Sequence, residues 1–373
     1  MAAARPALLL VAGEASGDAH AARVLERLRL RLPALDCFGL GGAQLCAAGL
    51  EPVADGAALN VVGLSEVFRG LSGVLGLRDR LLAEVERRRP AAALLVDLPG
   101  FNLHLAGRLK RMGVPVIYYI APQAWAWRRG RVRKIRRRVD QLCVIFPFER
   151  EFFGQRGVAV EYVGHPLLEQ RAPAAASSAE RVALVPGSRP REVERLLPAI
   201  AGAARRLRER WPELRFCLPL APGIAAGPVQ QTLAAAGVEA ELVGGGAAAA
   251  LRGARLGLVT SGTATLEAAL AKMPMVVVYR VSRTSYALVR PLFRLDHVCI
   301  VNILAGRRLV PELLQSAARP EPIAAAAAPL LADSTERCRV LAGLAEVTAG
   351  LAGPRPSERV ARILAARLQP EAA

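Results

Sequence analysis

The chain has 373 residues, of which 53% are hydrophobic and 22% charged, enough apolar sequence for two domains with separate cores. Aromatic residues make up only 5%, which favours helices packed on parallel strands over an all-β sandwich. The formal charge of +18 attracts polyanions, whether nucleic acid, anionic lipid headgroups or phosphorylated substrates. No apolar run approaches twenty residues, so we expect no bilayer-spanning helix.

The first half of the chain alternates short apolar runs with helical patterns. The opening run resembles a signal peptide, but it is short and is followed at once by Gly13, which favours a first buried strand. A helical pattern with apolar residues at 22, 25, 28 and 32 comes next. The predicted strands of this half are 7–12, 91–96, 116–120 and 142–145.

The second half repeats this organisation after a small, polar, Pro-containing stretch at 170–180, which we interpret as a linker. Residues 193, 197, 200, 204 and 207 form one apolar helix stripe, and 323–331 and 358–368 are further predicted helices. The predicted strands are 182–185, 216–220, 256–259 and 275–279.

These patterns predict an α/β protein with two doubly wound, Rossmann-like domains that face each other across a cleft, where ligands bind beyond the carboxyl ends of the strands. We assign residues 1–170, joined by the C-terminal helix 357–373, to the first domain and 181–350 to the second. Six cysteines without CxxC or zinc-like spacing indicate a reducing compartment and no disulfide framework.

Two loops of the second domain suit a nucleotide diphosphate. Gly187, Ser188 and Arg189 join a strand to a helix, where free backbone N–H groups and a guanidinium would bind phosphate. The alternative is an ordinary tight turn with a solvated arginine.

The second loop, 260–267, brings Ser261, Gly262 and Thr263 to another strand end, with Glu267 in the first helical turn, where its carboxylate would bind a ribose diol. The alternative is that Ser261 or Thr263 only caps the helix and that Glu267 complements the helix dipole.

In the first domain, Asp97 follows a buried strand and precedes Pro99 and Gly100, a suitable position for a general base. The alternative is an aspartate that caps its own loop. His20, His104 and His165 are single histidines, for which a structural role is more common than catalysis.

Two further segments point toward a lipid surface. Residues 60–82 are apolar on several faces, which indicates either a buried helix pair or a surface that dips into the headgroup region. Residues 128–138 carry eight cations in eleven positions, which suits either a solvated helix face or contact with anionic lipid.

Together these motifs resemble those of bacterial lipid-A-disaccharide synthases, which are GT-B glycosyltransferases. The resemblance covers about residues 7–315, and the segment around 121–128 is its most specific part. The matching motifs are AGEASGD at 12–18, VDLPGFN at 96–102, APQAWAWR at 121–128, PFE at 147–149, PGSR at 186–189, SGTATLE at 261–267, NILAGR at 302–307 and PELLQ at 311–315.

The resemblance implies an inverting transfer of 2,3-diacylglucosamine from its UDP derivative to 2,3-diacylglucosamine 1-phosphate. The products would be the β-1,6 lipid A disaccharide 1-phosphate and UDP, formed without cofactor or metal. It implies that Asp97 is required, with a role as base for the acceptor hydroxyl, and that Arg189, Glu267 and Asn302 lie on the UDP side.

From the same motifs we add Glu312 to the UDP side and assign the acceptor side of the cleft to Glu14, Ser16, Asp18, Asn102 and Gln123. The apolar segment implied to meet membrane or acyl chains includes Val62, Leu64, Val67, Phe68, Leu71 and Leu75. One departure is Gly100, where some relatives have a second aspartate, so we assign no carboxylate pair.

We therefore expect a cytoplasmic enzyme, peripheral on the cytoplasmic face of the inner membrane, that binds both lipid substrates and the anionic membrane surface, without a nucleic-acid partner. A homodimer is compatible with the sequence. The nearest alternatives are a UDP-sugar epimerase or a transferase to another lipid. More distant is an RNA-binding protein that uses the arginine run beside Trp125 and Trp127.

Overall fold

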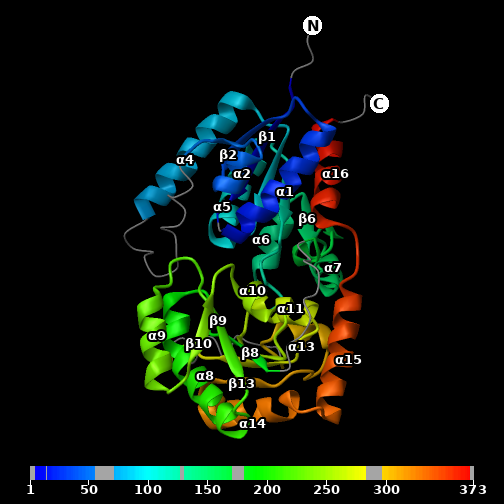
Figure 1. Ribbon diagram of the computed structural model, residues 1–373. Helices are drawn as coiled ribbons and strands as arrows, with labels where there is room; N and C mark the ends of the chain where they lie inside the picture. The colour runs from blue at the N-terminus through cyan, green and yellow to red at the C-terminus, as the bar shows by residue number, and fades with distance from the viewer. Residues whose placement is uncertain are drawn as a thin grey trace. The chain divides into compact units, whose positions relative to one another are not determined.

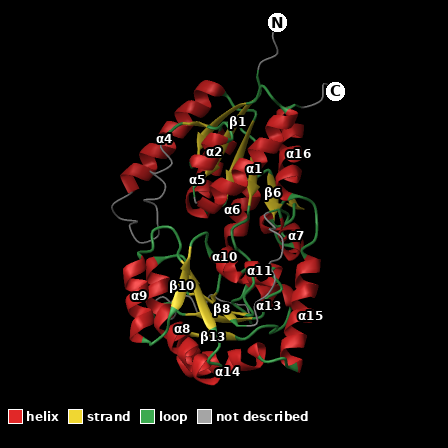
Figure 2. Cartoon of the chain, in the orientation of Figure 1, coloured by secondary structure: helices red, strands yellow, loops and turns green. Residues whose placement is uncertain are grey.

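The computed structural model describes residues 5–13, 15–54, 71–126, 130–169, 180–282 and 296–369 (Figure 1). The chain divides into two compact units, which we treat separately. Unit 1 combines residues 1–170 with 351–373, and unit 2 comprises residues 171–350. Each unit is built on one parallel sheet, with helices packed around its strands (Figure 2).

Unit 1 contains a seven-stranded sheet in the order β3-β2-β1-β4-β5-β6-β7. Its strands are β1 (Ala7–Ala12), β2 (Asp36–Leu40), β3 (Glu51–Pro52), β4 (Ala92–Val96), β5 (Val116–Tyr119), β6 (Gln141–Val144) and β7 (Val160–Tyr162). Its helices are α1 (Ala15–Arg31), α2 (Ala43–Ala47), α4 (Leu71–Arg88), α5 (Pro99–Arg111), α6 (Gly130–Arg138), α7 (Pro147–Gly154), the 3₁₀ turn Pro166–Leu168 and α16 (Pro356–Leu368).

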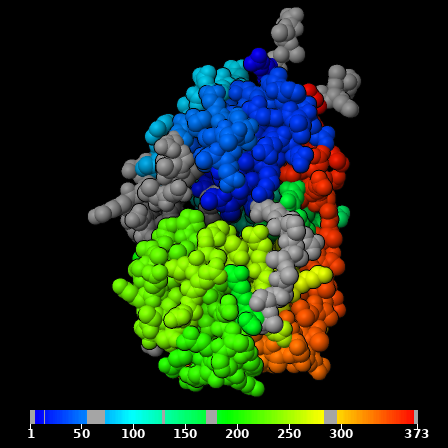
Figure 3. Space-filling model, viewed as in Figure 1, coloured from blue at the N-terminus to red at the C-terminus, as the bar shows by residue number. Residues whose placement is uncertain are grey.

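Helix α16 returns the chain to unit 1 and packs against α1, as Figures 1 and 3 show for the red and blue segments. Its buried side chains Val360 and Leu364 join the same core as Leu25 of α1. An ion pair between Arg31 and Glu358 adds to this contact at the surface. The last helix is therefore an integral part of the unit 1 core.

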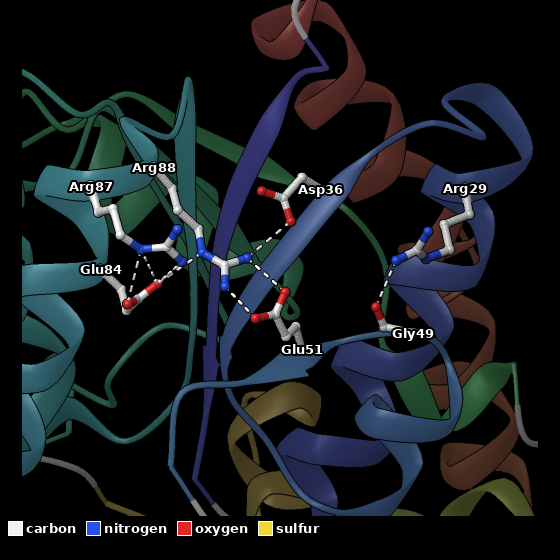
Figure 4. A network of polar contacts seen from close by, with 7 residues as sticks. All are labelled: Arg29, Asp36, Gly49, Glu51, Glu84, Arg87 and Arg88. Atoms are coloured by element: carbon white, nitrogen blue, oxygen red, sulfur yellow. Dashed lines mark hydrogen bonds and ion pairs between the residues drawn. The ribbon is translucent and has the colours of Figure 1, made fainter.

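Arg88, at the end of α4, fastens this helix to the outer strands of the sheet (Figure 4). Its guanidinium contacts Glu84 at 2.8 Å, Asp36 at 3.2 Å and Glu51 at 2.7 Å. The same group lies 4.7 Å from the centre of the Phe38 ring. Two residues of β2 and one of β3, together with Glu84 of α4 itself, thus contact one guanidinium, which fixes the carboxyl end of α4 against these strands.

Unit 2 contains a six-stranded sheet in the order β10-β9-β8-β11-β12-β13. Its strands are β8 (Arg181–Val185), β9 (Arg215–Pro219), β10 (Ala240–Val243), β11 (Leu256–Thr260), β12 (Met275–Tyr279) and β13 (Glu312–Leu314). Its helices are α8 (Pro190–Arg210), α9 (Ala226–Ala235), α10 (Ala247–Leu251), α11 (Thr263–Leu270), α13 (Ile300–Ala305), the 3₁₀ turn Gln315–Ala317, α14 (Pro320–Leu331) and α15 (Thr335–Gly350).

The predicted pair of doubly wound α/β domains is confirmed, and each predicted strand lies within about a residue of an observed one. The predicted apolar stripe of α8 is buried at all five positions. Five strands, β2, β3, β7, β10 and β13, have no counterpart among the predicted strands. Most of these are short or partly exposed strands toward the sheet edges, where the continuous apolar signal of a central strand is weak.

Parts of two predicted segments lie outside the described residues. These are residues 170–179 of the predicted linker and residues 60–70 of the predicted apolar segment. From Leu71 onward the apolar segment is the first part of α4. In the part of the chain that the structure describes, no helix is long and apolar enough to span a membrane.

Candidate active site

The strand order places two loops of each unit side by side. In both sheets the order reverses between the first strand and the strand beside it, between β1 and β4 in unit 1 and between β8 and β11 in unit 2. The pairing of Ala12 with Val96 and of Val185 with Val259 aligns the carboxyl ends of these strands. Ligands of doubly wound sheets bind beyond such ends, and the motif loops at 13–18, 97–102, 186–189 and 261–267 all follow them.

Asp97 begins the loop after β4 in a conformation that few side chains adopt. Asp97 and Leu98 have φ angles of +48° and +47°, in the left-handed region that costs about 1–3 kcal/mol for such a residue. On the neighbouring loop, a Cβ added at Gly13 would come within 2.6 Å of Leu98. A side chain at 13 would therefore displace the Leu98 side chain that packs on this loop.

Three hydrogen bonds hold the backbone of Asp97 in this conformation. Its N–H donates to the Tyr119 carbonyl at 3.0 Å, and its carbonyl accepts from the Asn102 amide at 2.9 Å and from the Tyr118 hydroxyl. Burial raises the pKa of Tyr118 well above its usual value, and the nearby Asp97 charge acts in the same direction. The backbone is thus fixed from both sides, which sets the direction of the partly exposed Asp97 side chain.

Asn102 binds the backbone of this loop from the protein interior. Its side chain is fully buried, and its amide also donates to the Val96 carbonyl at 3.1 Å. The sequence resemblance assigned Asn102 to the acceptor side of the cleft. Its bonds instead show a positioning residue that closes the turn from β4 into α5.

The other acceptor-side residues lie in different surroundings. Ser16 and Gln123 are exposed beyond the carboxyl ends of β1 and β5, whereas Glu14 lies outside the described residues. Asp18 is buried, and its carboxylate accepts from the N–H groups of Gly42 at 2.6 Å and Gln44 at 3.0 Å. Asp18 therefore anchors the start of α2, a role that its sequence motif did not indicate.

A buried carboxylate supports the loop after β5. Glu149 accepts from the indole N–H of Trp125 at 2.9 Å and from the N–H of Phe146 at 3.1 Å. Burial raises its pKa to about 7, against the lowering effect of these bonds. The rings of Trp125 and Phe148 meet edge to face at 5.0 Å. Trp125, Phe148 and Glu149 thus bring the two predicted motifs into contact.

The predicted histidines divide between the surface and the interior. His104 is exposed on α5, and its Nδ1 lies 2.7 Å from the Gly100 carbonyl. Burial lowers the pKa of His165 to about 3, with a smaller effect of His20. Burial also lowers the pKa of His20 to about 4, with a smaller effect of Arg23. Both are neutral at physiological pH.

In unit 2, the loop 186–189 leads into α8 as predicted, with Arg189 as N-cap and Pro190 at the first helical position. Gly187 has a φ of +130°. The Arg189 side chain is 68% exposed and lies 3.5 Å from Glu192, whose carboxylate also accepts from the Ser188 N–H at 3.3 Å. A carboxylate therefore lies where the sequence predicts a phosphate, and Glu192 was not among the predicted site residues.

The second loop of unit 2 presents Gly262 and Thr263 at the surface, with Gly262 as N-cap of α11 and no side-chain capping bond. The alternative of a capping Ser261 or Thr263 is therefore wrong, and the Ser261 hydroxyl donates to the Val298 carbonyl at 3.3 Å. The predicted first-turn position of Glu267 is also wrong, because four helical residues precede it.

Glu267 nevertheless has an oxygen available for a ligand. Its Oε2 is buried and has no hydrogen-bond partner among the described residues. Burial raises its pKa. A ribose diol would supply the missing donors to this carboxylate.

Asn302 and Glu312 form one network that ties three loops together. Asn302 is fully buried, donates to Glu312 at 2.6 Å and accepts from the N–H groups of Leu309 and Val310 at 2.9 Å. Glu312 accepts from the Val298 N–H at 3.0 Å. The N–H of Val298 donates to Glu312, and the carbonyl of the same residue accepts from the Ser261 hydroxyl. Asn302 thus supports the loop beside the predicted UDP side from within.

Of the predicted membrane segment, the structure describes only its end. Val62, Leu64, Val67 and Phe68 lie outside the described residues. Leu71 begins α4, and Leu75 is 43% exposed on the same helix. Leu75 is one of two large apolar side chains exposed to this degree in the described part of the chain.

Solved structures of similar fold agree with the two-unit architecture. The S. aureus MnaA–UDP co-structure aligns with a TM-score of 0.65 at 13% identity, covering 99% of this chain and 98% of that one. The glycotransferase of kitacinnamycin aligns with a TM-score of 0.64 at 17% identity, covering 98% and 99%. These likenesses confirm the predicted GT-B fold class.

Sequence comparison gives the family. The family model of lipid-A-disaccharide synthetase matches residues 8–351. The lipid-A-disaccharide synthase of Anaeromyxobacter sp. (strain K) is 46% identical over 365 residues, 95% of each chain. That of Myxococcus xanthus (strain DK1622) is 43% identical over 374 residues, 96% of this chain and 98% of its own. The chain therefore belongs to the lipid-A-disaccharide synthase family of glycosyltransferases, enzymes of lipid A biosynthesis.

Proposed function

We propose that this enzyme transfers 2,3-diacylglucosamine from UDP-2,3-diacylglucosamine to the 6-hydroxyl of 2,3-diacylglucosamine 1-phosphate, with inversion at the anomeric carbon. The C1–oxygen bond to the diphosphate breaks as the acceptor oxygen bonds to C1. The products are the β-1,6-linked disaccharide 1-phosphate and UDP. The acceptor hydroxyl is assigned to the switch-point loops of unit 1 and the donor to those of unit 2.

Asp97 takes the proton of the acceptor hydroxyl. The observation that carries this assignment is the fixed, left-handed backbone of Asp97 at the carboxyl end of β4. Such strain is retained where function requires a direction that a relaxed loop would not give. A carboxylate aimed in this way acts as a general base without a conformational search.

Unit 2 binds the donor. The diphosphate accepts from the loop N–H groups near Ser188 and Gly262 and from the Arg189 guanidinium, and the ribose diol donates to Glu267. When the diphosphate binds, the Ser188 N–H and Arg189 exchange Glu192 for phosphate oxygen. Donors aimed at a developing negative charge typically lower a barrier by about 3 kcal/mol each.

No metal ion takes part in this proposal, because the leaving diphosphate is stabilised by N–H groups and one arginine. We expect turnover to survive an excess of EDTA. Loss of activity with EDTA and its recovery with Mg²⁺ would contradict this part of the proposal.

The enzyme works at the cytoplasmic face of the inner membrane, where both lipid substrates reside. The net charge of +18 and the exposed Leu75 of α4 support attachment to an anionic surface. We expect binding to anionic vesicles that weakens as salt increases, because exposed charges are screened.

The decisive test supplies the purified protein with both substrates and analyses the product by mass spectrometry. We expect disaccharide 1-phosphate and one UDP for each disaccharide. Conversion of the UDP-sugar without the acceptor would instead indicate an epimerase or hydrolase, and transfer to a different lipid would reassign the acceptor.

A further inference from the structure

Unit 1 contains a basic cavity, and one of its lining residues, His104, lies beside the Gly100 carbonyl of the segment after β4. Its volume is about 510 Å³, and it lies among α4, α5 and α6. Its lining residues are Arg78, His104, Gly107, Arg108, Lys110, Arg111, Arg137 and Arg138. Six of these eight residues carry a positive charge, and none is acidic. We call this feature the basic cavity.

Few of these charges are neutralised by the protein itself. Arg78 pairs with Asp79 at 2.7 Å, and Lys110 pairs with Asp140. Across the described residues, the side chains of Arg108 and Arg137 have neither a hydrogen bond nor an ion pair, and both residues are exposed. Four arginines of the cavity therefore lack a carboxylate partner in the described part of the chain, and their mutual repulsion favours a bound anion.

The Arg138 side chain, which lines the cavity, is held in place by contacts with α5. Arg138 donates to the Leu103 carbonyl at 2.8 Å, which draws its guanidinium onto α5. A Cβ added at Gly107 would lie 3.1 Å from Nε and 3.2 Å from Cδ of Arg138. Glycine inside a helix reduces stability, but here it leaves room for a cation.

Helix dipoles account for part of the charge. Lys110 and Arg111 lie in the last turn of α5, and Arg137 and Arg138 in the last turn of α6, where cations are favourable. This reason does not apply to Arg78, which lies in the middle of α4. It also does not explain why cations from three helices line one concavity.

An apolar side chain lies on the same helix as Arg78. Leu75 precedes Arg78 by three residues, so the two share a face of α4, and Leu75 is 43% exposed. A cationic concavity with an apolar neighbour matches a ligand that has a phosphate next to hydrocarbon.

We propose that the basic cavity binds the phosphate ester of an anionic lipid. Its arginines bind the phosphate oxygens in the bidentate manner typical of guanidinium groups. Two lipids have this chemistry: a bilayer phospholipid, and the acceptor through its 1-phosphate. Only the second source depends on the proposed function. All of its lining residues belong to unit 1, whereas the proposed donor loops belong to unit 2.

The first experiment measures binding to phosphatidylcholine vesicles with and without phosphatidylglycerol. The test variant combines Arg108→Gln with Arg137→Gln. The control combines Arg362→Gln with Arg367→Gln, two exposed arginines of α16 in the same unit. We expect the test pair to weaken binding to the anionic vesicles by about 10- to 30-fold and the control pair to weaken it less than about 3-fold.

A second variant separates a cavity from general surface charge. Gly107→Leu keeps every charge but fills the space beside Arg138, so it tests the shape of the cavity and the placement of Arg138 at constant charge. We expect about a 10-fold loss of anionic vesicle affinity, with the unfolding temperature and UDP binding retained.

A second assay identifies the source of the phosphate. In detergent micelles without phospholipid, an increase in KM for the acceptor in the test pair assigns the cavity to the acceptor 1-phosphate. An unchanged KM together with weaker vesicle binding assigns it to a phospholipid. Equal behaviour of test and control pairs in both assays would overturn the proposal, as would tighter binding of RNA than of vesicles at physiological salt.

Failure here and failure of the proposed function are distinguishable. UDP binding reports on unit 2, and vesicle binding reports on the basic cavity. If the wild-type enzyme forms no disaccharide, the measurement of acceptor KM cannot be made, but the vesicle-binding measurement still tests the basic cavity.

Discussion

The two switch-point edges are made in different ways. In unit 1, the side chains of Asn102 and Tyr118 donate to the Asp97 carbonyl and keep its backbone at a strained, positive φ angle. In unit 2, the corresponding loop offers an exposed arginine and backbone N–H groups, with Glu192 as their present partner. A proton acceptor needs one direction, whereas a diphosphate has many oxygens and accepts from several donors. We therefore expect unit 1 to tolerate change less than unit 2.

The largest expected effect is that of Asp97→Asn. Loss of the base should reduce kcat by about 100- to 10,000-fold, since no second carboxylate is assigned beside it. The assay follows disaccharide formation, with circular dichroism as the folding check. Asp333→Asn removes an exposed carboxylate of unit 2 as a matched control. If Asp97→Asn retains more than a tenth of wild-type activity, Asp97 is not the base.

The second prediction concerns the pH dependence of unit 1. Burial raises the pKa of Glu149 from 4.5 to about 7, so the folded state holds more protons than the unfolded state between these values. The free energy of unfolding must therefore fall as pH rises through this window, by about 3 kcal/mol for this group.

Denaturant unfolding at pH 4.5 and pH 7.5 measures this effect as the difference between wild type and Glu149→Gln. The variant cannot titrate at this position, and the hydrogen bonds that it loses are lost at both pH values. The change in unfolding free energy with pH therefore differs between the two proteins only through the titration of Glu149. Parallel pH profiles of the two proteins would show that the pKa of Glu149 is the same in the folded and unfolded states, contrary to this prediction.

Asn102→Leu tests whether the loop of Asp97 needs its internal support. The substitution removes the bonds to the Val96 and Asp97 carbonyls and replaces the amide with an apolar side chain of similar size. We expect kcat to fall by about 10- to 100-fold, with an unchanged acceptor KM, because the loop loses two of the hydrogen bonds that fix its backbone and can relax. A higher acceptor KM at full kcat would indicate direct contact with the acceptor.

Arg189→Gln should have the smallest effect of this set. Loss of one exposed guanidinium should raise the donor KM by about 10-fold, while the loop N–H groups remain. Isothermal titration with UDP gives the affinity directly. Arg205→Gln, further along α8, changes the same charge away from the loop. An equal effect of both substitutions would show that Arg189 acts only through net charge.

The same contrast explains which features the sequence predicted. The central strands are continuous apolar runs, and the motif loops follow them directly, so the fold class and the positions of Asp97 and Arg189 could be predicted. The role of Asn102 could not, because its partners are backbone carbonyls that only the folded turn brings within reach. Asp18 belongs to the same class, since the N–H groups that it binds lie 24 or more residues away.

Glu192 and the basic cavity were missed for another reason. Glu192 lies about one helical turn after the motif at 186–189, and its carboxylate accepts from the Ser188 N–H. The cavity collects charges from α4, α5 and α6. Only the α6 part forms a visible run in the sequence. A concavity made by three helices has no linear signature.

The return of α16 to unit 1 has a consequence for synthesis on the ribosome. Unit 2 is continuous in the chain, so it can fold as soon as residue 350 has left the exit tunnel. Unit 1 can complete its fold only after Val360 and Leu364 have been synthesised and have left the tunnel. Until then the apolar face of α1 that packs against α16 is uncovered. During this interval the nascent chain exposes a surface that chaperones recognise, and truncation before α16 should trap the protein in that state.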